Sequence, residues 1–562
     1  MQQEQLTTAQ SASAARVIGS GAAAILFTKT GGVLKLSASV RPSNPWDAQL
    51  QIPIAFGLSK GDTLLVRFSV RALKAQPETG EGRTAVILER GEPPYTKSLN
   101  QNIPVGRAWK EWNLPFTAVE DVPTGKVNLN FHFGFGAQTI EFQNISLVNY
   151  KASKRASELP RTRLTYAGVE PGAPWRAEAD KRIEKYRKAP LTVKVVDKKT
   201  GKPIPGVQVE ITQQSHAFAF GTAVAADHLI ATGADANRYR EVFQKYFNRA
   251  TIENHLKWPF WEAWNKTDGL RALEWLNEKK IPVRGHCLLW PSWRNSPPNI
   301  KALAGDKAAL TKRIEAHFAE VAGACQGKVV DWDVVNEPFD NHDITDILGR
   351  DSLIRWFKLA QKHDSKARLF LNDYPAMDGS DTGNAHLNHF EETLRFLQKG
   401  GAPLQGIGFQ GHFGASPVPP TRVLSCLDRF GKLGLPIAIT EFDINMEDEQ
   451  LQADYTRDFL TACFSHPSVS EIITWGFWEK RHWFPKAALW RTDWSIKPNG
   501  QAWVDLTTKK WWTSARGTTN AQGRFAVRGF HGEHEVHVTQ AGKTATQRAL
   551  LSRPGATLTL RL

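Results

Sequence analysis

Cysteine and long apolar segments are both scarce in this sequence. It has 4 cysteines in 562 residues, far apart and without the paired spacing of a metal site. All of them fall in predicted elements of the central region, so we expect buried free thiols rather than a disulfide framework: Cys287, Cys325, Cys426 and Cys463. No run is long and apolar enough to span a bilayer, and we expect no membrane insertion.

A signal peptide is also missing from the visible sequence. The first residues, MQQEQLTTAQ, lack a basic segment, and the later run AAAILF is too short for the apolar core of such a peptide. These residues predict either a cytoplasmic chain or an export signal that lies outside this sequence.

Signatures of nucleic-acid binding are absent, although the formal net charge is +15. Such a charge suits an acidic polysaccharide or a nucleic acid, but a solvated basic surface is the commoner explanation. No lysine/arginine block and no basic stripe interleaved with aromatics is present, so we expect no nucleic-acid partner. The histidines show no paired ligand spacing, and the sequence predicts no metal and no cofactor.

The length of 562 residues predicts two to four domains, because one core rarely extends so far. Residues 1–21 are polar and rich in Ala, Ser and Gln, which favours a disordered N-terminus. From 22 to 150, alternating segments such as TLLVRFSVRAL and NLNFHFGF are separated by Gly, Pro, Asn and Asp turns. This pattern is typical of an all-β sandwich.

The 22–150 segment resembles the jelly-roll carbohydrate-binding modules that often accompany polysaccharide hydrolases. Aromatic rings can stack on sugar rings at low entropy cost, and they equally well fill the core of a sandwich. The sequence leaves both roles open for its aromatic candidates, which are Trp46, Tyr95, Trp109 and Trp112.

Residues 151–189 form a linker rich in Lys, Arg and Pro that ends in the helical segment WRAEADKRIEKYRK, expected to lie on a neighbouring domain. Residues 190–213 follow as a hairpin-like pair of strands around a Gly/Pro turn, and a matching β-rich segment covers 514–562. Together the two segments resemble one small Ig-like β-sandwich that is split by the region between them. The alternative is a separate C-terminal module, with the first hairpin capping the central domain.

Strand-like and helix-like segments alternate eight times between residues 214 and 513. The strand candidates are short apolar runs such as IPVRGHCLLW. The helix candidates carry apolar residues at helical spacing, and several begin after Asp, Thr or Pro. Eight β/α units predict an α/β fold, the (β/α)8 TIM barrel, with the β-sandwiches as accessory domains.

Two glutamates each end a predicted barrel strand. Glu337 closes the run VVDWDVVNEP on the fourth strand, and Glu441 lies in PIAITEFDI on the seventh. The carboxyl ends of the strands carry the chemistry of this fold, and a pair of carboxylates is the equipment of a retaining glycosidase. The sequence therefore predicts Glu337 and Glu441 as a catalytic pair.

Other strand ends add polar and aromatic side chains to the same face of the barrel. They stand in the segments TIENHLKW, RGHCLLW, GIGFQGH and ITWGFW, with Trp483 beyond the last. Together these motifs resemble glycoside hydrolase family 10, the endo-β-1,4-xylanases, over residues 190–512. The resemblance implies double-displacement hydrolysis of internal β-1,4 bonds of xylan, with Glu337 as acid/base and Glu441 as nucleophile.

The same resemblance implies roles for further residues. Asn336 would bind the sugar 2-hydroxyl beside the scissile bond, where a hydrogen bond strengthens as the oxocarbenium ion forms. His412 and Asp443 would form a hydrogen-bonded support for Glu441. The residues implied to line the glycone subsites are Glu253, Asn254, Lys257, His286, Trp290, Gln410, His412, Trp475 and Trp483.

The sequence departs from the family pattern at one place. The family follows RGHxLxW with His-x-Gln, whose glutamine reaches the sugar, whereas Pro291 and Trp293 occupy those positions here. A hydrogen bond to the distal glycone sugar is lost, which leaves open a decorated xylan or a different β-linked pyranose. Trp293 and Trp478 are candidates to extend the cleft, and we expect burial between helices for Trp261 and Trp264.

The leading hypothesis is a monomeric retaining endo-β-1,4-xylanase acting on xylan or xylo-oligosaccharides. Because polymeric xylan lies outside cells, we expect an extracellular or periplasmic location. One alternative is a retaining β-glycanase of the same clan that acts on another β-linked polysaccharide. Another, from a different class, is a non-catalytic glycan-binding protein, although such a binder has no need of two carboxylates.

Overall fold

The structure, a computed structural model, divides into two compact units. The first consists of residues 1–166 and 413–417, and the second of 167–412 and 418–562. The residues that the structure describes are 4–19, 25–75, 81–263, 266–375, 377, 385–415 and 417–562.

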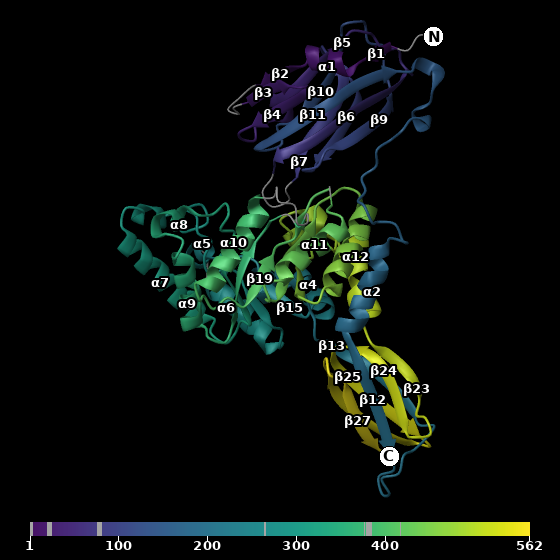
Figure 1. Ribbon diagram of the computed structural model, residues 1–562, viewed down its shortest axis with the longest axis vertical. Helices are drawn as coiled ribbons and strands as arrows, with labels where there is room; N and C mark the ends of the chain where they lie inside the picture. Colours follow the sequence, from purple (N-terminus) through teal and green to yellow (C-terminus); the bar gives the residue numbers. More distant parts are fainter. Residues whose placement is uncertain are drawn as a thin grey trace. The chain divides into compact units, whose positions relative to one another are not determined.

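Two antiparallel sheets form the sandwich of the first unit (Figure 1). Strand residues alternate between the core and the outer faces, so three phenylalanines from facing strands meet inside: the ring of Phe131 lies 5.1 Å from that of Phe68 and 4.8 Å from that of Phe142. One sheet has the order β3 (Ile25–Thr30), β4 (Val33–Ala38), β11 (Gln138–Asn149), β6 (Thr63–Lys74), β9 (Lys110–Thr117), with β1 (Glu4–Leu6) also on β11; the other has the order β2 (Arg16–Gly19), β5 (Ala48–Ile54), β10 (Val127–His132), β7 (Gly82–Arg90), β8 (Lys97–Val105).

The N-terminal segment is ordered from residue 4 to 19, and the predicted disorder is wrong there. Helix α1 (Thr8–Ala14) begins with a capping box, in which the Thr7 side chain accepts the Gln10 N–H and the Gln10 side chain accepts the Thr7 N–H. β1 pairs with β11 and β2 pairs with β5. Composition does not reveal these sheet-edge hydrogen bonds, because they depend on distant strands. Residues 1–3, 20 and 21 lie outside the described part.

The four aromatic candidates of this unit fall into different environments. Trp112 is buried in the core between the sheets, so it is not available for stacking on a sugar. Trp109 is half-buried, with the Arg71 guanidinium 4.7 Å from its ring. Trp46 and Tyr95 are exposed.

Parallel strands form a closed barrel in the second unit, which confirms the predicted (β/α)8 fold. β17 and β21 are buried along their whole length, as expected for strands covered by helices on one face and by side chains of the barrel interior on the other. The strands, in order around the barrel, are β14 (Ala219–Val224), β15 (Arg249–Ile252), β16 (Val283–Gly285), β17 (Asp331–Asn336), β18 (Arg368–Asp373), β19 (Gly406–Phe409), β21 (Ile437–Ile444) and β22 (Val469–Thr474), with β20 (His412–Phe413) beside β21. β22 pairs with β14 and closes the ring.

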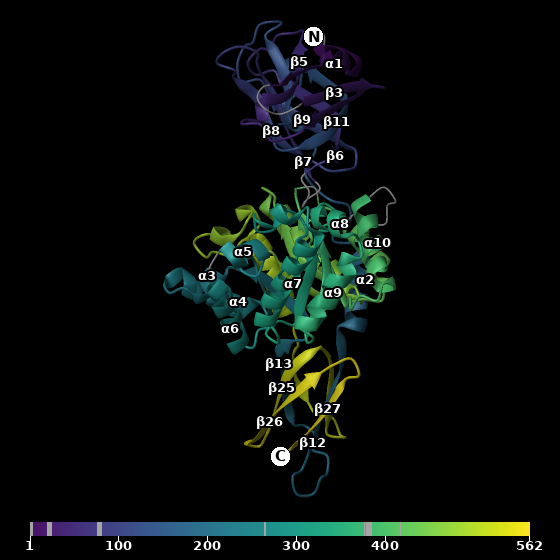
Figure 2. The same ribbon diagram turned by 90° about the vertical axis from the view of Figure 1, so that its left-hand side faces the viewer.

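Helices surround this barrel (Figures 1 and 2). Two of them begin after an aspartate, with Asp306 and Asp448 accepting the first free N–H groups of α7 (Lys307–Ala324) and α12 (Glu449–Ser465). The others are α3 (Ala226–Ile230), α4 (Ala234–Tyr246), α5 (Trp258–Ala263), α6 (Lys266–Glu278), α8 (Asp343–Leu348), α9 (Ser352–His363), α10 (Ala385–Lys399), α11 (Pro420–Gly431) and α13 (Pro498–Asp505). Of the helices in the described chain, none combines the length and apolar character that crossing a bilayer requires.

A second sandwich is built from both ends of the second unit, and Figure 1 shows its blue and yellow strands side by side. Its three-stranded sheet has the order β24 (Arg524–Phe530), β12 (Lys188–Val196), β27 (Ala556–Arg561); its four-stranded sheet has the order β23 (Ser514–Thr518), β13 (Gln208–His216), β25 (Gly532–Gln540), β26 (Lys543–Leu551). The expected hairpin of 190–213 is wrong, because β12 and β13 belong to opposite sheets. Their apolar sides, represented by Val193 and Val209, face each other across one core.

The linker helix α2 (Pro174–Tyr186) packs on barrel helix α12. Arg176 forms a two-pronged ion pair with the fully buried Asp458, with both N–O distances at 2.6 Å. Arg187 then donates to the Phe464, His466 and Val469 carbonyls, and burial lowers its pKa to about 10. These contacts fix the path of the chain from the helix into the C-terminal sandwich.

Candidate active site

The two predicted catalytic glutamates lie at the carboxyl-end face of the barrel. Glu337 directly follows β17, Glu441 lies in the second half of β21, and they are 7% and 4% exposed. Each is tied to a neighbouring strand end, since the Glu337 N–H donates to the Asn372 carbonyl and the Glu441 N–H to the Gln410 carbonyl, both at 2.8 Å. The barrel topology therefore brings together residues that are 104 positions apart in the sequence.

Neutral carboxamides surround the Glu337 carboxylate. They donate from Gln410 Nε2 and Asn336 Nδ2 to Oε1 at 2.7 and 3.1 Å, and from Asn341 Nδ2 to Oε2 at 3.3 Å. Amide dipoles orient a carboxyl group without placing a full opposite charge beside it. This arrangement suits a group that must gain and lose a proton.

The surroundings of Glu441 contain a histidine as well as an amide. Asn372 Nδ2 donates to its Oε1 at 2.8 Å, and His412 Nε2 lies 3.3 Å from its Oε2. His286 Nδ1 is 4.0 Å from Oε1.

His412 is held between two carboxylates. Its Nδ1 lies 3.0 Å from Asp443 Oδ1, and Trp483 Nε1 donates to Asp443 Oδ2 at 2.5 Å. Burial alone would lower the pKa of His412, but Asp443 and Glu441 together raise that pKa to about 10. The ring is therefore an imidazolium at neutral pH, and it places a positive charge beside Glu441.

Asn372 connects the two carboxylates. Its Nδ2 donates at 2.8 Å both to Glu441 and to Asn336 Oδ1, while its Oδ1 accepts from Thr440 Oγ1 at 2.7 Å. A Cβ at Gly408 would lie 2.4 Å from the same Oδ1, so only glycine fits beside this amide. The network fixes the amide orientation of Asn336 and thereby points its N–H group at Glu337.

A buried ion network forms the floor of the site. Asp333 accepts from Arg284 Nε at 3.1 Å and lies 2.9 Å from His286 Nδ1, while Arg284 Nη1 lies 2.8 Å from Glu471. Burial alone would lower the pKa of Arg284, but Asp333 and Glu471 raise it. The guanidinium thus keeps Asp333 ionised, and Asp333 orients His286 toward the site.

Aromatic walls enclose a lysine on the other side of the site. Lys257 Nζ is 5.6 Å from the Trp290 ring and 5.7 Å from the Trp475 ring, and it donates to Asn254 Oδ1 at 3.1 Å. The edge of the His286 ring meets Trp475 at a centroid distance of 5.0 Å. Apolar faces beside a hydrogen-bond donor are suited to a pyranose ring and its hydroxyls.

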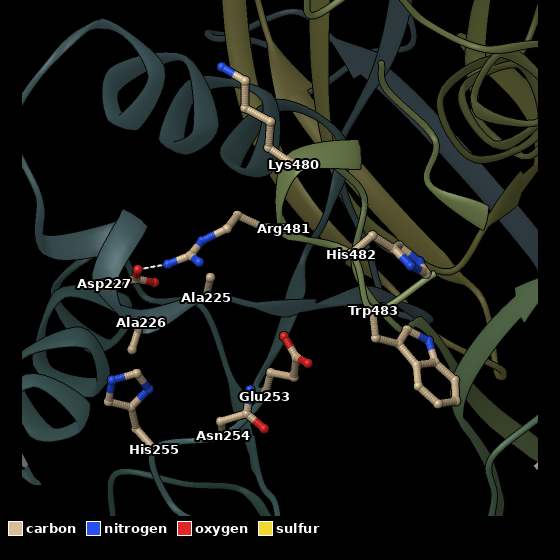
Figure 3. Close-up of a pocket in the computed structure, with 10 residues that line it drawn as sticks. All are labelled: Ala225, Ala226, Asp227, Glu253, Asn254, His255, Lys480, Arg481, His482 and Trp483. Carbon is tan, nitrogen blue, oxygen red and sulfur yellow. Dashed lines mark ion pairs between the residues drawn. The ribbon is translucent and has the colours of Figure 1, made fainter. Parts of the chain in front are cut away.

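A cavity of about 460 Å³ continues from these residues (Figure 3). Glu253, Asn254 and Trp483 line it together with Asp227 and Arg481, which form an ion pair. Burial raises the pKa of Glu253. The site therefore extends beyond the carboxylate pair, as subsites for a polymer require.

The cysteines take no part in this site. Every one of them is buried and free, in agreement with the prediction. Burial raises the pKa of Cys287 far above its ordinary range, so its thiol is a packing group rather than a nucleophile. Within the described residues, no group of three or more His, Cys, Asp or Glu side chains is placed to hold a metal ion.

A comparison with known families decides the classification. The model described as "Glycosyl hydrolase family 10" matches residues 210–506, which is more than half of the chain. The chain belongs to glycosyl hydrolase family 10.

Individual relatives of this family-10 chain carry different names. The anti-sigma-I factor RsgI6 of Acetivibrio thermocellus is 32% identical over 406 residues, covering 71% of this chain and 51% of that protein. Endo-1,4-beta-xylanase 1 of Arabidopsis thaliana is 31% identical over 362 residues, covering 64% of this chain and 37% of that protein. The chain thus spans about half of the length of these relatives, or less. The solved xylanase 10B from Thermotoga petrophila RKU-1, in complex with xylobiose, is 28% identical with a TM-score of 0.48, over 52% of this chain and 95% of that one.

The loop that departs from the family-10 pattern reaches the catalytic pair indirectly. The Trp293 N–H donates to Asp343 at 2.9 Å, and Asn295 Nδ2 donates to Asn341 Oδ1 at 2.9 Å. Asn341 in turn donates to Glu337, as described above. The loop after Pro291 therefore helps to orient Glu337, one of the two predicted catalytic residues.

One tryptophan proposed for the cleft lies elsewhere, and another is buried as the sequence predicts. Trp478 is buried and stacks on Trp494 at 4.4 Å, so the suggestion that it extends the cleft is wrong. Trp261 is buried as expected, with its Nε1 donating to Glu320 at 3.0 Å. Trp264 lies outside the described residues.

Sequence reasoning assigned no role to three residues of this family-10 site. Asn372 lies next to the end of β18, so its position at a strand end was a usable signal, whereas Asp333 lies in the middle of the run VVDWDVVNEP. Asn341 had none, because it follows the strand in a loop whose path the sequence pattern does not predict.

Proposed function

We propose that this chain is a retaining endo-β-1,4-xylanase. The observation that carries the proposal is the pair of buried carboxylates with contrasting partners: Glu337 among neutral amides and Glu441 beside the cationic His412. Family-10 membership and the relatives named endo-1,4-beta-xylanases support xylan as the substrate class. Such a substrate implies action outside the cell or in the periplasm.

In the first step Glu441 acts as the nucleophile. One of its carboxylate oxygens bonds to the anomeric carbon while the bond to the departing sugar oxygen breaks, and Glu337 gives its proton to that oxygen. The positive charge of His412 lies beside the Glu441 carboxylate before the attack. Negative charge leaves Glu441 as the ester forms, and Glu337 becomes the carboxylate.

In the second step Glu337 acts as the base. It takes a proton from water, whose oxygen bonds to the anomeric carbon from the side opposite to Glu441. The glycosyl–Glu441 bond breaks, and both carboxyl groups return to their starting states. Two inversions leave the anomeric configuration unchanged.

The other residues bind and orient the sugar. Asn336 is directed by Asn372 and would donate to the 2-hydroxyl, while Lys257 stands between Trp290 and Trp475 as a further donor. Interactions that strengthen as the oxocarbenium ion develops accelerate the reaction more than uniform substrate binding does.

A product profile tests the proposal. The purified chain is incubated with soluble glucuronoarabinoxylan, carboxymethylcellulose and mannan, with Glu441→Gln as the inactive control. We expect short xylo-oligosaccharides from the first polymer only. Cleavage of another glycan alone would transfer the proposal to a different β-glycanase of the clan. No cleavage of any polymer would favour the non-catalytic glycan binder.

We also propose glycan binding by the first unit, on the outer side of the sheet that contains β5, β10 and β7. Leu129 and Phe131 of β10 point into the core, so Asn130 points outward, yet it is only 1% exposed. Its Nδ2 donates to Glu89 at 2.7 Å, while its Oδ1 has no hydrogen-bond partner in the described part of the chain. Such an acceptor suits a sugar hydroxyl, and the 53% exposed Trp46 stands near this face.

Affinity electrophoresis of the full chain in xylan tests this second role. Asn130→Ala and Trp46→Ala are expected to lose retardation by the polymer, while hydrolysis of short xylo-oligosaccharides stays unchanged. Tyr95→Ala serves as the control for an exposed aromatic elsewhere in the unit. Retardation equal to that of the unmodified chain in both variants would refute a binding site on this face.

A further inference from the structure

The C-terminal sandwich carries a disproportionate share of the positive charge. Its two segments, 188–213 and 514–562, contain 12 Lys and Arg residues but 4 Asp and Glu residues, against a net charge of +15 for the whole chain. About half of the net charge therefore belongs to one small domain. Its distribution over the two sheets is uneven.

Unpaired cations gather on the outer side of the three-stranded sheet. Val193 and Leu560 point into the core, which directs Lys194 and Arg561 outward, and Arg524 stands directly opposite Lys194 on the next strand. None of these three cations forms an ion pair with another described residue, and β12, β24 and β27 contain no Asp or Glu. Like charges on directly opposite residues destabilise a sheet.

The loop after β12 extends the same cluster. Lys198, Lys199 and Lys202 are exposed there, and the loop is anchored at this end of the sheet because the Lys198 N–H donates to the Leu562 carbonyl. The one acid of the loop, Asp197, accepts hydrogen bonds from Thr200 and from the Lys199 N–H. We name the six cations the basic end face: Lys194, Lys198, Lys199, Lys202, Arg524 and Arg561.

Four of the six other cations of this sandwich form ion pairs among the described residues, and the exceptions are Lys543 and Arg553. On the opposite sheet, Arg516 lies 2.6 Å from Glu210 and Arg548 lies 3.5 Å from Glu535. At the barrel end of the three-stranded sheet, Arg528 pairs with Glu184. A generally basic surface would spread its unpaired charges, so the concentration at one end points to an anionic partner.

The chemistry of the face selects the kind of anion. Outward positions beside its cations are filled by small side chains such as Thr192, Ala526 and Thr559, which offer no ring for stacking on nucleic-acid bases and no large apolar group for insertion into a membrane. A polysaccharide with occasional carboxylates and many hydroxyls matches spaced Lys and Arg donors.

We infer that the basic end face binds the uronic-acid carboxylates of an acidic polysaccharide and holds the chain on that polymer. The choice of a uronate-bearing xylan as the acidic polysaccharide rests on the proposed function. The inference that this face binds an anion does not depend on the proposed function. The expected binding is electrostatic and therefore weakens as salt is added.

The test compares two polymers that differ only in charge. Insoluble glucuronoxylan and the same polymer after reduction of its carboxyl groups are incubated with the full chain carrying Glu441→Gln, which prevents degradation. Arg524→Gln/Arg561→Gln is the test variant, and Arg516→Gln/Arg548→Gln is the matched control, with the same loss of charge on the other sheet. The difference between the polymers isolates carboxylate-dependent binding from any neutral glycan binding by the first unit.

The chain is expected to bind glucuronoxylan more tightly than the reduced polymer. The test variant should lose this preference, a several-fold weakening that disappears at high salt, while the control variant stays within twofold of the parent. Equal weakening of both variants, or no weakening of the test variant, would overturn the inference. So would equal affinity for DNA or for anionic phospholipid vesicles with the same dependence on Arg524 and Arg561.

A failure of this inference is distinguishable from a failure of the proposed function. Binding is measured on an inactive chain, whereas the proposed function is measured by release of products from the active one. When the same Arg→Gln substitutions are made in the active chain, both variants should hydrolyse short neutral xylo-oligosaccharides at the parent rate. This result would also show that the variants are folded.

Discussion

The surroundings of Glu337 and of Glu441 differ in charge rather than in burial. Both carboxylates are almost fully enclosed and both accept from carboxamides, but Glu441 also has the cationic His412 beside it. Asp443 sustains that cation, since together with Glu441 it raises the pKa of His412 to about 10. Two strands of one barrel, β17 and β21, thus provide one carboxylate among neutral amides and one with a cationic neighbour.

This difference shows how one barrel face can separate two roles between identical side chains. Neutral dipoles position a carboxyl group in either protonation state, whereas a full charge favours the ionised state. The separation depends on the residues that surround each carboxylate. It can be tested by removing each carboxylate and then each supporting residue.

The largest effect is expected from Glu441→Ala. Removal of the nucleophile should lower kcat by about 10⁴-fold or more, because no covalent intermediate can form. With an activated aryl xyloside, added azide should enter the space left behind and give the α-glycosyl azide. Substantial residual turnover with retained configuration would contradict the nucleophile assignment.

Glu337→Ala should produce a smaller and selective loss. Poor leaving groups need the proton, so xylan hydrolysis should fall by about 10²- to 10⁴-fold, while an activated aryl glycoside still forms the intermediate. Azide should now yield the β-glycosyl azide, since the intermediate on Glu441 is intact. Equal losses on both substrates would remove Glu337 from the acid role.

Asp443→Asn should change the pH profile more than the fold. Without its negative charge the pKa of His412 falls from about 10, so the imidazolium is lost at lower pH and the alkaline limb of kcat/KM moves down. A histidine whose pKa is raised in the folded state stabilises the fold fully below its ordinary pKa of about 6.5, and this contribution is lost as pH rises toward 10. Over that range the unfolding free energy of the unmodified chain should therefore fall more steeply than that of the variant. Identical alkaline limbs in the two proteins would contradict the cationic role of His412.

Asn341→Ala is expected to have the smallest effect. It removes a 3.3 Å donor that orients the Glu337 carboxyl group, so kcat on xylan should fall by about tenfold or less. Asn295→Ala, which only releases Asn341, should lower kcat less. An unchanged kcat in both variants would contradict the orienting role of Asn341.

Much of the barrel was predictable because its strands are continuous apolar runs that end in polar motifs. That pattern located Glu337, Glu441 and most residues around them, since parallel strands deliver their carboxyl ends to one face. Asn341 escaped prediction because it acts from a loop. The hairpin expected from 190–213 failed because alternation identifies strands but not their partners.

The residues at the strand ends can thus be identified from the local sequence, because an apolar run and the polar residues after it are consecutive in the chain. The cationic state of His412 and the lack of ion pairs at Lys194, Arg524 and Arg561 cannot be identified in this way. They depend on the charges that distant segments bring within a few ångströms or leave out of reach, and Coulomb interactions follow that separation rather than the separation along the chain.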